Sequence, residues 1–403
     1  MSLTLLIDLD NTLLTNTVET FVPAYMKALS DFMAPLISPD RFFNALLTAT
    51  RKMLQNQDPE CYLKDVFDAT FYPQLGVTPE YLRPPLEKFY AEVFPTLKPL
   101  TKPRPEAIHL VRDALDRGYR VAVATNPLFP LTAIEQRLSW AGLSPKEYPF
   151  SFVPSYETTH FAKPNPAFLA EMLARLGWSK EPAIMIGDDP DNDIQCANKL
   201  GIPSFLVDGK IPGFNSPVAY GEGSLTEILP WIDSLTPENL QPDHSSPLAL
   251  QAILRSTPAA LHSLCQMLPL NQWNIRYQPG EWCQTEILCH LRDVETELNL
   301  PRLKKVIQET NPFIPGQDTD RWAEERDYIS QDGLQALSQF NTSRKRLLAL
   351  LSQLQPEDWQ RPARHAIFGP TTLHELITII SGHDQLHIQQ LHSLIQSFRQ
   401  PRS

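Results

Sequence analysis

Cysteine is scarce in this chain of 403 residues, and its five cysteines are odd in number and form no CxxC pair. Such usage excludes a disulfide framework and is typical of a reducing compartment. Long apolar runs are missing as well, so no segment predicts a membrane span. The first residues carry Asp8 and Asp10 without a basic stretch, which argues against a secretory signal. We therefore expect a cytoplasmic protein with no membrane partner.

An excess of positive charge is also missing, because the formal net charge is −11. General nucleic-acid binding needs a basic stripe, so we expect no nucleic-acid partner. Short basic clusters at 302–305 and 344–346 are interpreted as solvated helix faces. The length and the 42% apolar content predict a globular protein of two domains.

Strand and helix signals alternate in part of the chain. Buried strands are predicted at 119–125, 182–187 and 203–207, and together with residues 1–14 they indicate an α/β core with a parallel, Rossmann-like sheet. This core comprises residues 1–14 and 101–232.

The remaining segments show helical patterns only. Residues 15–100 predict about four helices broken by prolines, and residues 233–247 have the Ser, Pro, Asp and Asn content of a linker. Residues 248–400 predict a four-helix bundle with helices at 248–267, 284–309, 331–354 and 372–398.

The most informative segment is the first, MSLTLLIDLDNTLL, in which an apolar strand leads into Asp8 and Asp10. Two carboxylates at the end of a buried strand are electrostatically costly. A bound cation and a reacting electrophile are the usual reasons to tolerate them. Because alternate strand residues point to the same side, we expect the two side chains to converge.

Further acids follow a later predicted strand, at Asp188 and Asp193. Together with Asp8 and Asp10 they can supply the hard oxygen ligands that Mg²⁺ prefers. The sequence therefore predicts a magnesium site at the carboxyl ends of the strands, where open α/β sheets bind ligands.

Groups suited to a phosphate lie between these acids. Thr125 ends a predicted strand and offers a hydroxyl, and the next residue, Asn126, offers a backbone amide. Lys163 brings a point charge that would neutralise a phosphate and keep a carboxylate nucleophile ionised. The four motifs in this order predict phosphoryl chemistry.

The segments LIDLDNTLL, VATN, KPNP and IGDDPDND resemble the four motifs of the haloacid dehalogenase (HAD) superfamily of hydrolases. The resemblance implies that Asp8 attacks phosphorus and forms an aspartyl-phosphate. Asp10 would protonate the leaving oxygen and later deprotonate water. Thr125 and Lys163 would bind the transferring phosphoryl group.

The same resemblance assigns the metal site and the cap. Asp8, the main-chain carbonyl of Asp10 and Asp188 would hold Mg²⁺, supported by Asp193. The second acid, Asp10, favours a phosphatase over a carbon–halogen dehalogenase, while a phosphomutase stays open. Residues 15–100 match the helical cap of the family, which implies a small phosphorylated metabolite as substrate.

Three histidines lie on apolar helix faces in the last part of the chain. His383 and His387 are one helical turn apart, and His290 falls on the apolar stripe of another predicted helix. Three imidazoles in one bundle core favour a transition-metal site. Core histidines bonded to carbonyls are the alternative, and His374 is predicted to lie outside the site.

Residues 248–398 resemble the DinB-like helical bundle superfamily, through PGEWCQTEILCHLRDVE around His290 and FGPTTLHELITIISGHDQLHIQQL around His383 and His387. The resemblance implies a three-histidine centre for Zn²⁺ or Ni²⁺. It leaves open whether the bundle is a metal-dependent thiol transferase or a non-catalytic binding or dimerisation module that regulates the phosphatase. A homodimer is thus one partner that the sequence leaves open.

Overall fold

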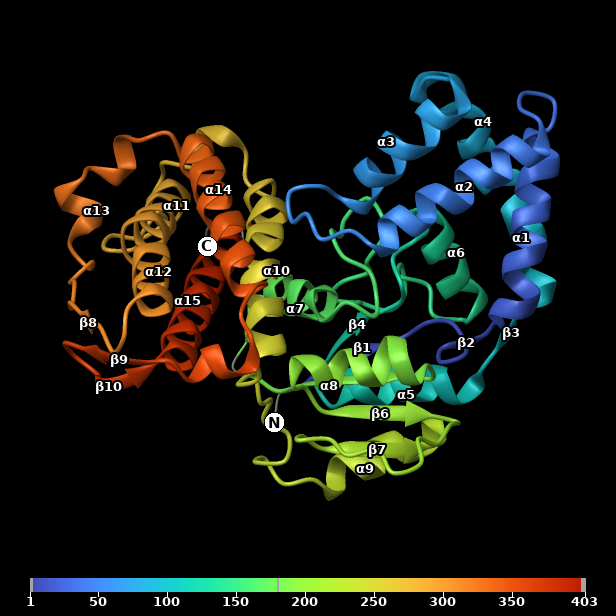
Figure 1. Ribbon diagram of the computed structural model, residues 1–403. Helices are drawn as coiled ribbons and strands as arrows, with labels where there is room; N and C mark the ends of the chain where they lie inside the picture. Colours follow the sequence, from blue (N-terminus) through green and yellow to red (C-terminus); the bar gives the residue numbers. More distant parts are fainter. Residues whose placement is uncertain (1–2, 180, 400–403) are drawn as a thin grey trace. The chain divides into compact units, whose positions relative to one another are not determined.

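The computed structural model describes residues 3–179 and 181–399 (Figure 1). Contacts divide the chain into two compact units, Met1–Leu169 with Lys180–His244 and Ala170–Ser179 with Ser245–Ser403. One boundary falls inside helix α7, Pro166–Arg175. Each unit is described by itself.

The first unit contains a five-stranded sheet in the order β4-β1-β5-β6-β7, with all neighbours parallel. The strands are β1 Thr4–Ile7, β4 Arg120–Val123, β5 Ala183–Gly187, β6 Ser204–Val207 and β7 Tyr220–Gly223. The central strands β1 and β5 are fully buried, as expected where helices cover both faces of a parallel sheet. The predicted α/β class and the strands near 119–125, 182–187 and 203–207 are confirmed.

Strand β7 was not predicted, because its sequence YGEG has neither an apolar run nor β-branched residues. Its glycine Gly221 packs closely on the sheet. A Cβ at that position would lie 2.6 Å from the Phe205 ring and 2.7 Å from the Trp231 ring. Tertiary packing therefore selects this strand.

The helices that accompany the sheet are α5 Pro105–Asp116, α6 Leu131–Trp140, α8 Cys196–Leu200 and α9 Ile228–Ser234. The segment before α8 forms a π-helical turn, η3 Pro190–Gln195. Helix α6 carries one residue that becomes important below.

A helical insert follows β1 and is termed the cap. It contains α1 Val18–Met33, α2 Pro39–Leu54, α3 Leu63–Leu75 and α4 Pro79–Lys88, followed by the turns η1 Phe89–Val93 and η2 Phe94–Leu100. The chain enters and leaves the cap through a short antiparallel ribbon, β2 Leu14–Thr15 with β3 Lys102–Pro103. The two linkers therefore run side by side.

The cap is also hydrogen-bonded to the loop that precedes Lys163. The first amides of α3, at Leu63 and Lys64, donate to the carbonyls of Thr159 (2.9 Å) and Tyr156 (2.7 Å). These amides have no partner inside their own helix. The loop thus completes the hydrogen bonding of α3.

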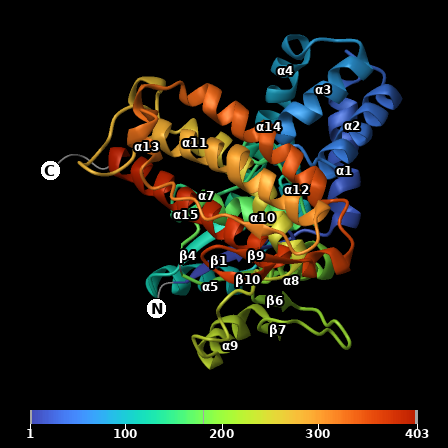
Figure 2. The ribbon, with the colours of Figure 1, turned by 60° about the vertical axis from the view of Figure 1, so that its left-hand side comes forward.

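The second unit is a helical bundle of α10 Pro247–Cys265, α11 Gln284–Asp293 with α12 Leu300–Gln308, α14 Gly333–Leu351 and α15 Leu373–Arg399 (Figure 2). These helices correspond to the four that were predicted. Helices α11 and α12 are joined without a loop by a π-helical turn, η6 Val294–Asn299.

A small sheet in the second unit was not predicted. Its strands β8 Phe313–Ile314, β9 Pro362–His365 and β10 Gly369–Thr372 pair in the order β10-β9-β8. Each has only two to four residues, which is too short for a period-two signal. Within the described ranges, no helix has the length and apolar character that crossing a bilayer requires.

Candidate functional sites

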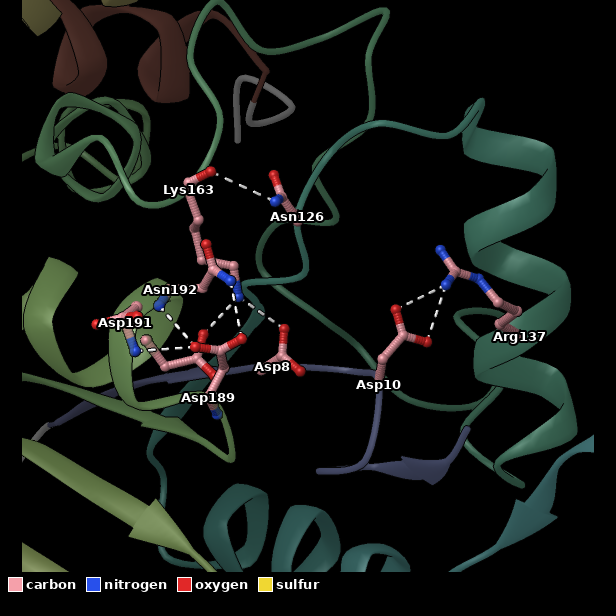
Figure 3. A network of polar contacts seen from close by, with 9 residues as sticks. Asp8, Asp10, Asn126, Arg137, Lys163, Asp189, Asp191 and Asn192 are labelled. Atoms are coloured by element: carbon pink, nitrogen blue, oxygen red, sulfur yellow. Dashed lines mark hydrogen bonds and ion pairs between the residues drawn. The ribbon is translucent and has the colours of Figure 1, made fainter. Parts of the chain in front are cut away.

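Asp8 lies directly after β1, and its amide donates to the carbonyl of Ile186 at the end of β5 (2.9 Å). Its side chain is buried next to Lys163 (Figure 3). The Lys163 ammonium lies 2.7 Å from Oδ1 of Asp8 and 2.5 Å from Oδ1 of Asp193. Lys163, only 2% exposed, therefore clamps two carboxylates that come from different strand ends.

Asp193 is positioned by η3, where its Oδ2 accepts the amide of Asp189 (3.0 Å). The close approach to β5 depends on Gly187. A Cβ at this glycine would lie 2.1 Å from Oδ2 of Asp193. Only glycine therefore allows the acid to reach the strand end in this position.

Asp8, Asp188 and Asp193 each offer a carboxylate oxygen, and the three atoms lie within 4.8 Å of one another. Burial raises the pKa of Asp8 to about 8, although Lys163 acts in the opposite direction. Burial, reinforced by the charge of Asp8, raises the pKa of Asp188 to about 6. Three carboxylates lie beside one lysine, which pairs with two of them, and their donor atoms are all oxygen. The cluster therefore fits a hard divalent cation such as Mg²⁺.

Asp10 does not converge on Asp8, so that prediction was wrong. Strand β1 ends at Ile7, and the alternation of side chains holds only inside a strand. The Asp10 carboxylate points away from Asp8 toward Arg137, as Figure 3 shows. Nη1 of Arg137 donates to both Asp10 oxygens (2.9 and 2.8 Å), and Nδ2 of Asn16 donates to one (2.7 Å).

Arg137 was missed in the sequence analysis. It lies on α6 and is only 1% exposed, with its guanidinium 4.5 Å from the centre of the Phe129 ring. Its Nε and Nη2 atoms are buried without a hydrogen-bond partner. Its position was a usable signal, because it falls three residues after the buried Ile134 and hence on the apolar face of the helix.

The phosphate-binding candidates lie at the end of β4. The amide of Ala124 donates to the carbonyl of Ile7 (2.7 Å), which places Thr125 beside the β1 end. Thr125 is buried, and Asn126 donates through Nδ2 to the carbonyl of Lys163 (3.4 Å). The Oδ1 atom of Asn126 is buried without a partner. The structure thus brings these residues to the same sheet edge as Asp8.

A cavity of about 670 Å³ lies between the cap and the segments around 128–136 and 156–157. Its wall is mainly apolar and rich in aromatic side chains. The aromatic members are Tyr25, Phe42, Phe67, Phe71, Tyr72, Tyr90, Phe129 and Tyr156.

The second unit brings together His290 from α11 with His383 and His387 from α15. Nε2 of His383 lies 3.1 Å from Nε2 of each of the other two. One imidazole nitrogen carries either a proton or a lone pair, so it cannot donate to one partner and accept from the other. Three nitrogens bound to a tetrahedral metal at its usual bond length lie roughly 3.3 Å apart. The arrangement therefore fits a transition metal.

The protonation state of the three histidines agrees with that fit. Burial lowers the pKa of His290 to about 3 and that of His387 to about 4, and it also lowers the pKa of His383. Neutral imidazole is the form that binds metals. The ring of Trp282 is parallel to His387, with 5.8 Å between centroids. His374 contacts the carbonyl of Ser245 through Nε2 (2.6 Å).

Arg344 is fully buried, so the prediction of a solvated face at 344–346 was wrong for this residue. Its Nε lies 2.6 Å from Glu295, its Nη1 contacts Asp384, and its Nη2 lies 3.0 Å from Asp384. Both acids come from other helices, 49 and 40 positions away. A local reading of the basic cluster could not reveal them.

Comparison with known proteins assigns both parts of the chain. A model of the haloacid dehalogenase-like hydrolase family matches residues 5–207, and a model of the DinB superfamily matches residues 253–391. The chain therefore belongs to the haloacid dehalogenase-like hydrolases and carries in addition a DinB-like domain.

Individual relatives match one part or the other. A protein of Oceanobacillus iheyensis named as a metal-dependent hydrolase, OB0782, is 30% identical over 141 residues, which cover 35% of this chain and 81% of that protein. The phosphoserine phosphatase of Thermus thermophilus is 31% identical over 135 residues, 34% of this chain and half of that enzyme. A HAD phosphatase structure from Thermococcus onnurineus covers 58% of this chain and 98% of its own, with 22% identity and a TM-score of 0.38.

Proposed function

We propose that the first unit is a Mg²⁺-dependent phosphomonoester hydrolase that works through an aspartyl-phosphate on Asp8. The observation that carries this proposal is the buried clamp of Lys163 on Asp8 and Asp193, with Asp188 beside it. Burial favours the protonated form of Asp8 even beside the Lys163 ammonium. Bound Mg²⁺ would supply the further positive charge that keeps the carboxylate ionised as a nucleophile.

The first step forms a bond between an Asp8 oxygen and phosphorus while the bond from phosphorus to the leaving oxygen breaks. Asp10 gives a proton to that oxygen, for which its carboxylate turns away from Arg137. Lys163, Thr125 and Asn126 hold the oxygens of the phosphoryl group. Bound Mg²⁺ would offset the negative charge that gathers between phosphate and carboxylates.

The second step releases the product and restores the enzyme. Asp10 takes a proton from water, the water oxygen bonds to phosphorus, and the bond from phosphorus to Asp8 breaks. Inorganic phosphate leaves, and the two carboxylates return to their first state. The net reaction consumes one water for each ester bond.

The named relatives support a small phosphorylated substrate. They are the phosphoserine phosphatase already described and a glyceraldehyde 3-phosphate phosphatase of Methanothermobacter thermautotrophicus, which is 28% identical over 112 residues. A phosphomutase would use the same residues but would transfer the phosphoryl group to a second substrate. Release of inorganic phosphate in water separates the two activities.

The experiment is to trap the covalent intermediate. Acid-quenched turnover of p-nitrophenyl phosphate should place one phosphoryl group on the peptide that contains Asp8, detected by mass spectrometry. Asp10→Asn should accumulate this species, because an activated leaving group needs no acid while hydrolysis of the intermediate still needs a base. Asp8→Asn should never show it. Label on any other residue would contradict the proposal.

For the second unit, we infer a transition-metal centre, Zn²⁺ or Ni²⁺, at His290, His383 and His387. Within the described ranges the cluster consists of these three histidines alone. Three protein ligands with a free fourth position are typical of catalytic rather than structural zinc. The metal-dependent hydrolase relative supports a catalytic role, and metal analysis with a thiol-transfer assay separates it from a purely binding module.

A further inference from the structure

The aromatic cavity borders the side of the first site that faces Asp10. The connection runs through two contacts, because Arg137 binds the Asp10 carboxylate and its guanidinium stacks on Phe129. The Phe129 ring lines the cavity, and so does Gln136, the neighbour of Arg137. The cavity therefore lies on the Asp10 side of the site, with Arg137 and Phe129 between it and the carboxylate that protonates the leaving oxygen in the proposed function.

The size of the cavity exceeds what a short polar leaving group needs. A dry apolar cavity of about 150 Å³ already holds one benzene ring. The cavity here measures about 670 Å³, within the usual range of small-molecule sites. It has room for a leaving group with several rings.

The walls favour flat apolar groups. Phe67 and Phe71 are stacked with 4.7 Å between centroids, Phe67 meets Tyr156 edge-on at 6.1 Å, and Tyr25 packs on Phe129 at 5.1 Å. The hydroxyl groups of Tyr25 and Tyr90 are 2.8 Å apart and satisfy one another. These rings form an apolar aromatic surface on which a bound ring can pack.

The charges at the wall largely cancel. Lys64 forms an ion pair with Asp68, and the other charged lining residues are Arg83, Glu87 and Glu157. Glu157 accepts the backbone amide of Leu131 (3.1 Å). Two cations and two acids provide no excess of positive charge for a second anionic group. The occupant should therefore be uncharged apart from its phosphate.

We propose that this cavity receives the leaving group, and that the substrate is the phosphomonoester of a large, apolar, ring-bearing alcohol. This inference rests on the proposed function, since the phosphate itself would be held at Asp8 and Lys163. It differs from the substrates named for the phosphatase relatives, which are small and polar.

The test compares two esters with the same reacting group, ethyl phosphate and 2-(2-naphthyl)ethyl phosphate. Both release a primary alkoxide, so a difference in kcat/KM reports the bound body and not the chemistry. We expect the naphthyl ester to be favoured by about 100-fold, which corresponds to burying one apolar ring system. Equal kcat/KM values would overturn the inference.

A matched pair of variants locates the effect. Thr50 lines the cavity from α2, while Thr48 on the same helix lies outside the lining and donates its hydroxyl to the carbonyl of Asn44. Thr50→Trp should fill the cavity and lower kcat/KM for the naphthyl ester at least about tenfold, with ethyl phosphate unchanged. Thr48→Trp should change neither. A similar loss in both variants, or none in Thr50→Trp, would contradict the assignment.

Binding of the alcohol alone separates this inference from the proposed function. Calorimetry with 2-(2-naphthyl)ethanol should show binding to the wild-type chain and to Asp8→Asn, and weakened binding to Thr50→Trp. Binding without any phosphate release would sink the hydrolase proposal and leave the cavity assignment standing. Phosphate release without binding of the alcohol would do the reverse.

Discussion

The two candidate metal sites of this chain solve opposite electrostatic problems. In the first unit, three carboxylates lie together and a single lysine pairs with two of them, and burial raises the pKa of Asp8 to about 8. In the second unit, three neutral imidazoles meet, and burial lowers their pKa values. The first site needs a cation to balance charge. The second offers the lone pairs of neutral nitrogen ligands instead.

This difference predicts that the two sites bind different metals. It also predicts that an empty site costs more electrostatic free energy in the first unit than in the second. Oxygen donors with net negative charge suit Mg²⁺, whereas imidazole nitrogens suit zinc, nickel and related ions. The bundle also holds a fully buried ion cluster, in which Glu295 and Asp384 neutralise Arg344. If the proposed function holds, buried charge serves catalysis in the first unit, whereas in the second unit the Arg344 cluster joins neighbouring helices.

Asp8→Asn should separate the activities of the two sites most clearly. The variant removes the proposed nucleophile but keeps the size of the side chain, so release of phosphate from p-nitrophenyl phosphate should fall roughly a thousandfold or more. Zinc and nickel bound by the chain, measured by elemental analysis on the same sample, should not change. Retained turnover would refute the nucleophile assignment.

His387→Ala should have the opposite effect and impair only the site in the bundle. Loss of one of three nitrogen ligands should deplete the bundle of transition metal, while phosphate release stays within about twofold of wild type. His374→Ala on the same helix is the control, because His374 contacts the carbonyl of Ser245 and not the other histidines. Equal metal content in both variants would remove the three-histidine claim.

Removing the cation from each buried ionic cluster should sharpen the comparison further. Arg344→Met leaves Glu295 and Asp384 buried and uncompensated, and should destabilise the bundle by about 3–5 kcal/mol in chemical denaturation. Arg346→Met, at an exposed position of the same basic cluster, is the matched control and should have little effect.

In the first unit, Lys163→Met should lose activity at saturating Mg²⁺, and added Mg²⁺ should recover much of its stability. If added Mg²⁺ leaves the stability of the Lys163→Met variant unchanged, that result would argue against a metal at the carboxylates.

A smaller effect is expected from Arg137→Met. Arg137 holds Asp10 in the resting position from which its carboxylate turns to the leaving oxygen. Without this anchor, esters that need a proton on the leaving oxygen should suffer most. We expect kcat/KM for ethyl phosphate to fall about tenfold more than that for p-nitrophenyl phosphate. A purely structural role would lower both by the same factor, and that outcome would contradict the positioning role.

The smallest effect should come from Glu157→Gln at the cavity wall. Burial raises the pKa of Glu157, so the folded state holds its proton more readily than the unfolded state. Ionisation of this group therefore costs stability above its raised pKa, and that cost disappears as the pH falls below the ordinary range of a glutamate. The variant should melt slightly higher than wild type at pH 7 and equally at pH 4. A lower melting temperature at pH 7 would show that the hydrogen bond to Leu131 outweighs the charge.

Much of the fold was accessible from the sequence, for a physical reason. Strands such as β4 and β5 are buried on both faces and therefore read as unbroken apolar runs, and the long helices α10 and α15 carry apolar stripes. Strand β7 and the small sheet of the second unit depend on packing by distant segments, and so left no local signal.

The site shows the same limit at the level of side chains. Most of the motif residues could be named because they follow strand ends, but the direction of Asp10 is decided by Arg137, 127 positions away. Arg344 likewise depends on acids from two other helices. Buried ion pairs between distant segments are invisible to any local pattern, while the three histidines were found because helical spacing is local.

The hydrogen bonds between α3 and the loop at 156–159 couple any movement of the cap to movement of the loop that carries Lys163. Tyr156 and Thr159 precede Lys163 by seven and four residues, so this short stretch of backbone links the cap to the ammonium that grips Asp8 and Asp193. A swing of α3 either breaks the bonds from Leu63 and Lys64 or pulls on the lysine loop. The hydrogen-exchange rates of these two amides therefore report how often the cap separates from the loop that carries Lys163.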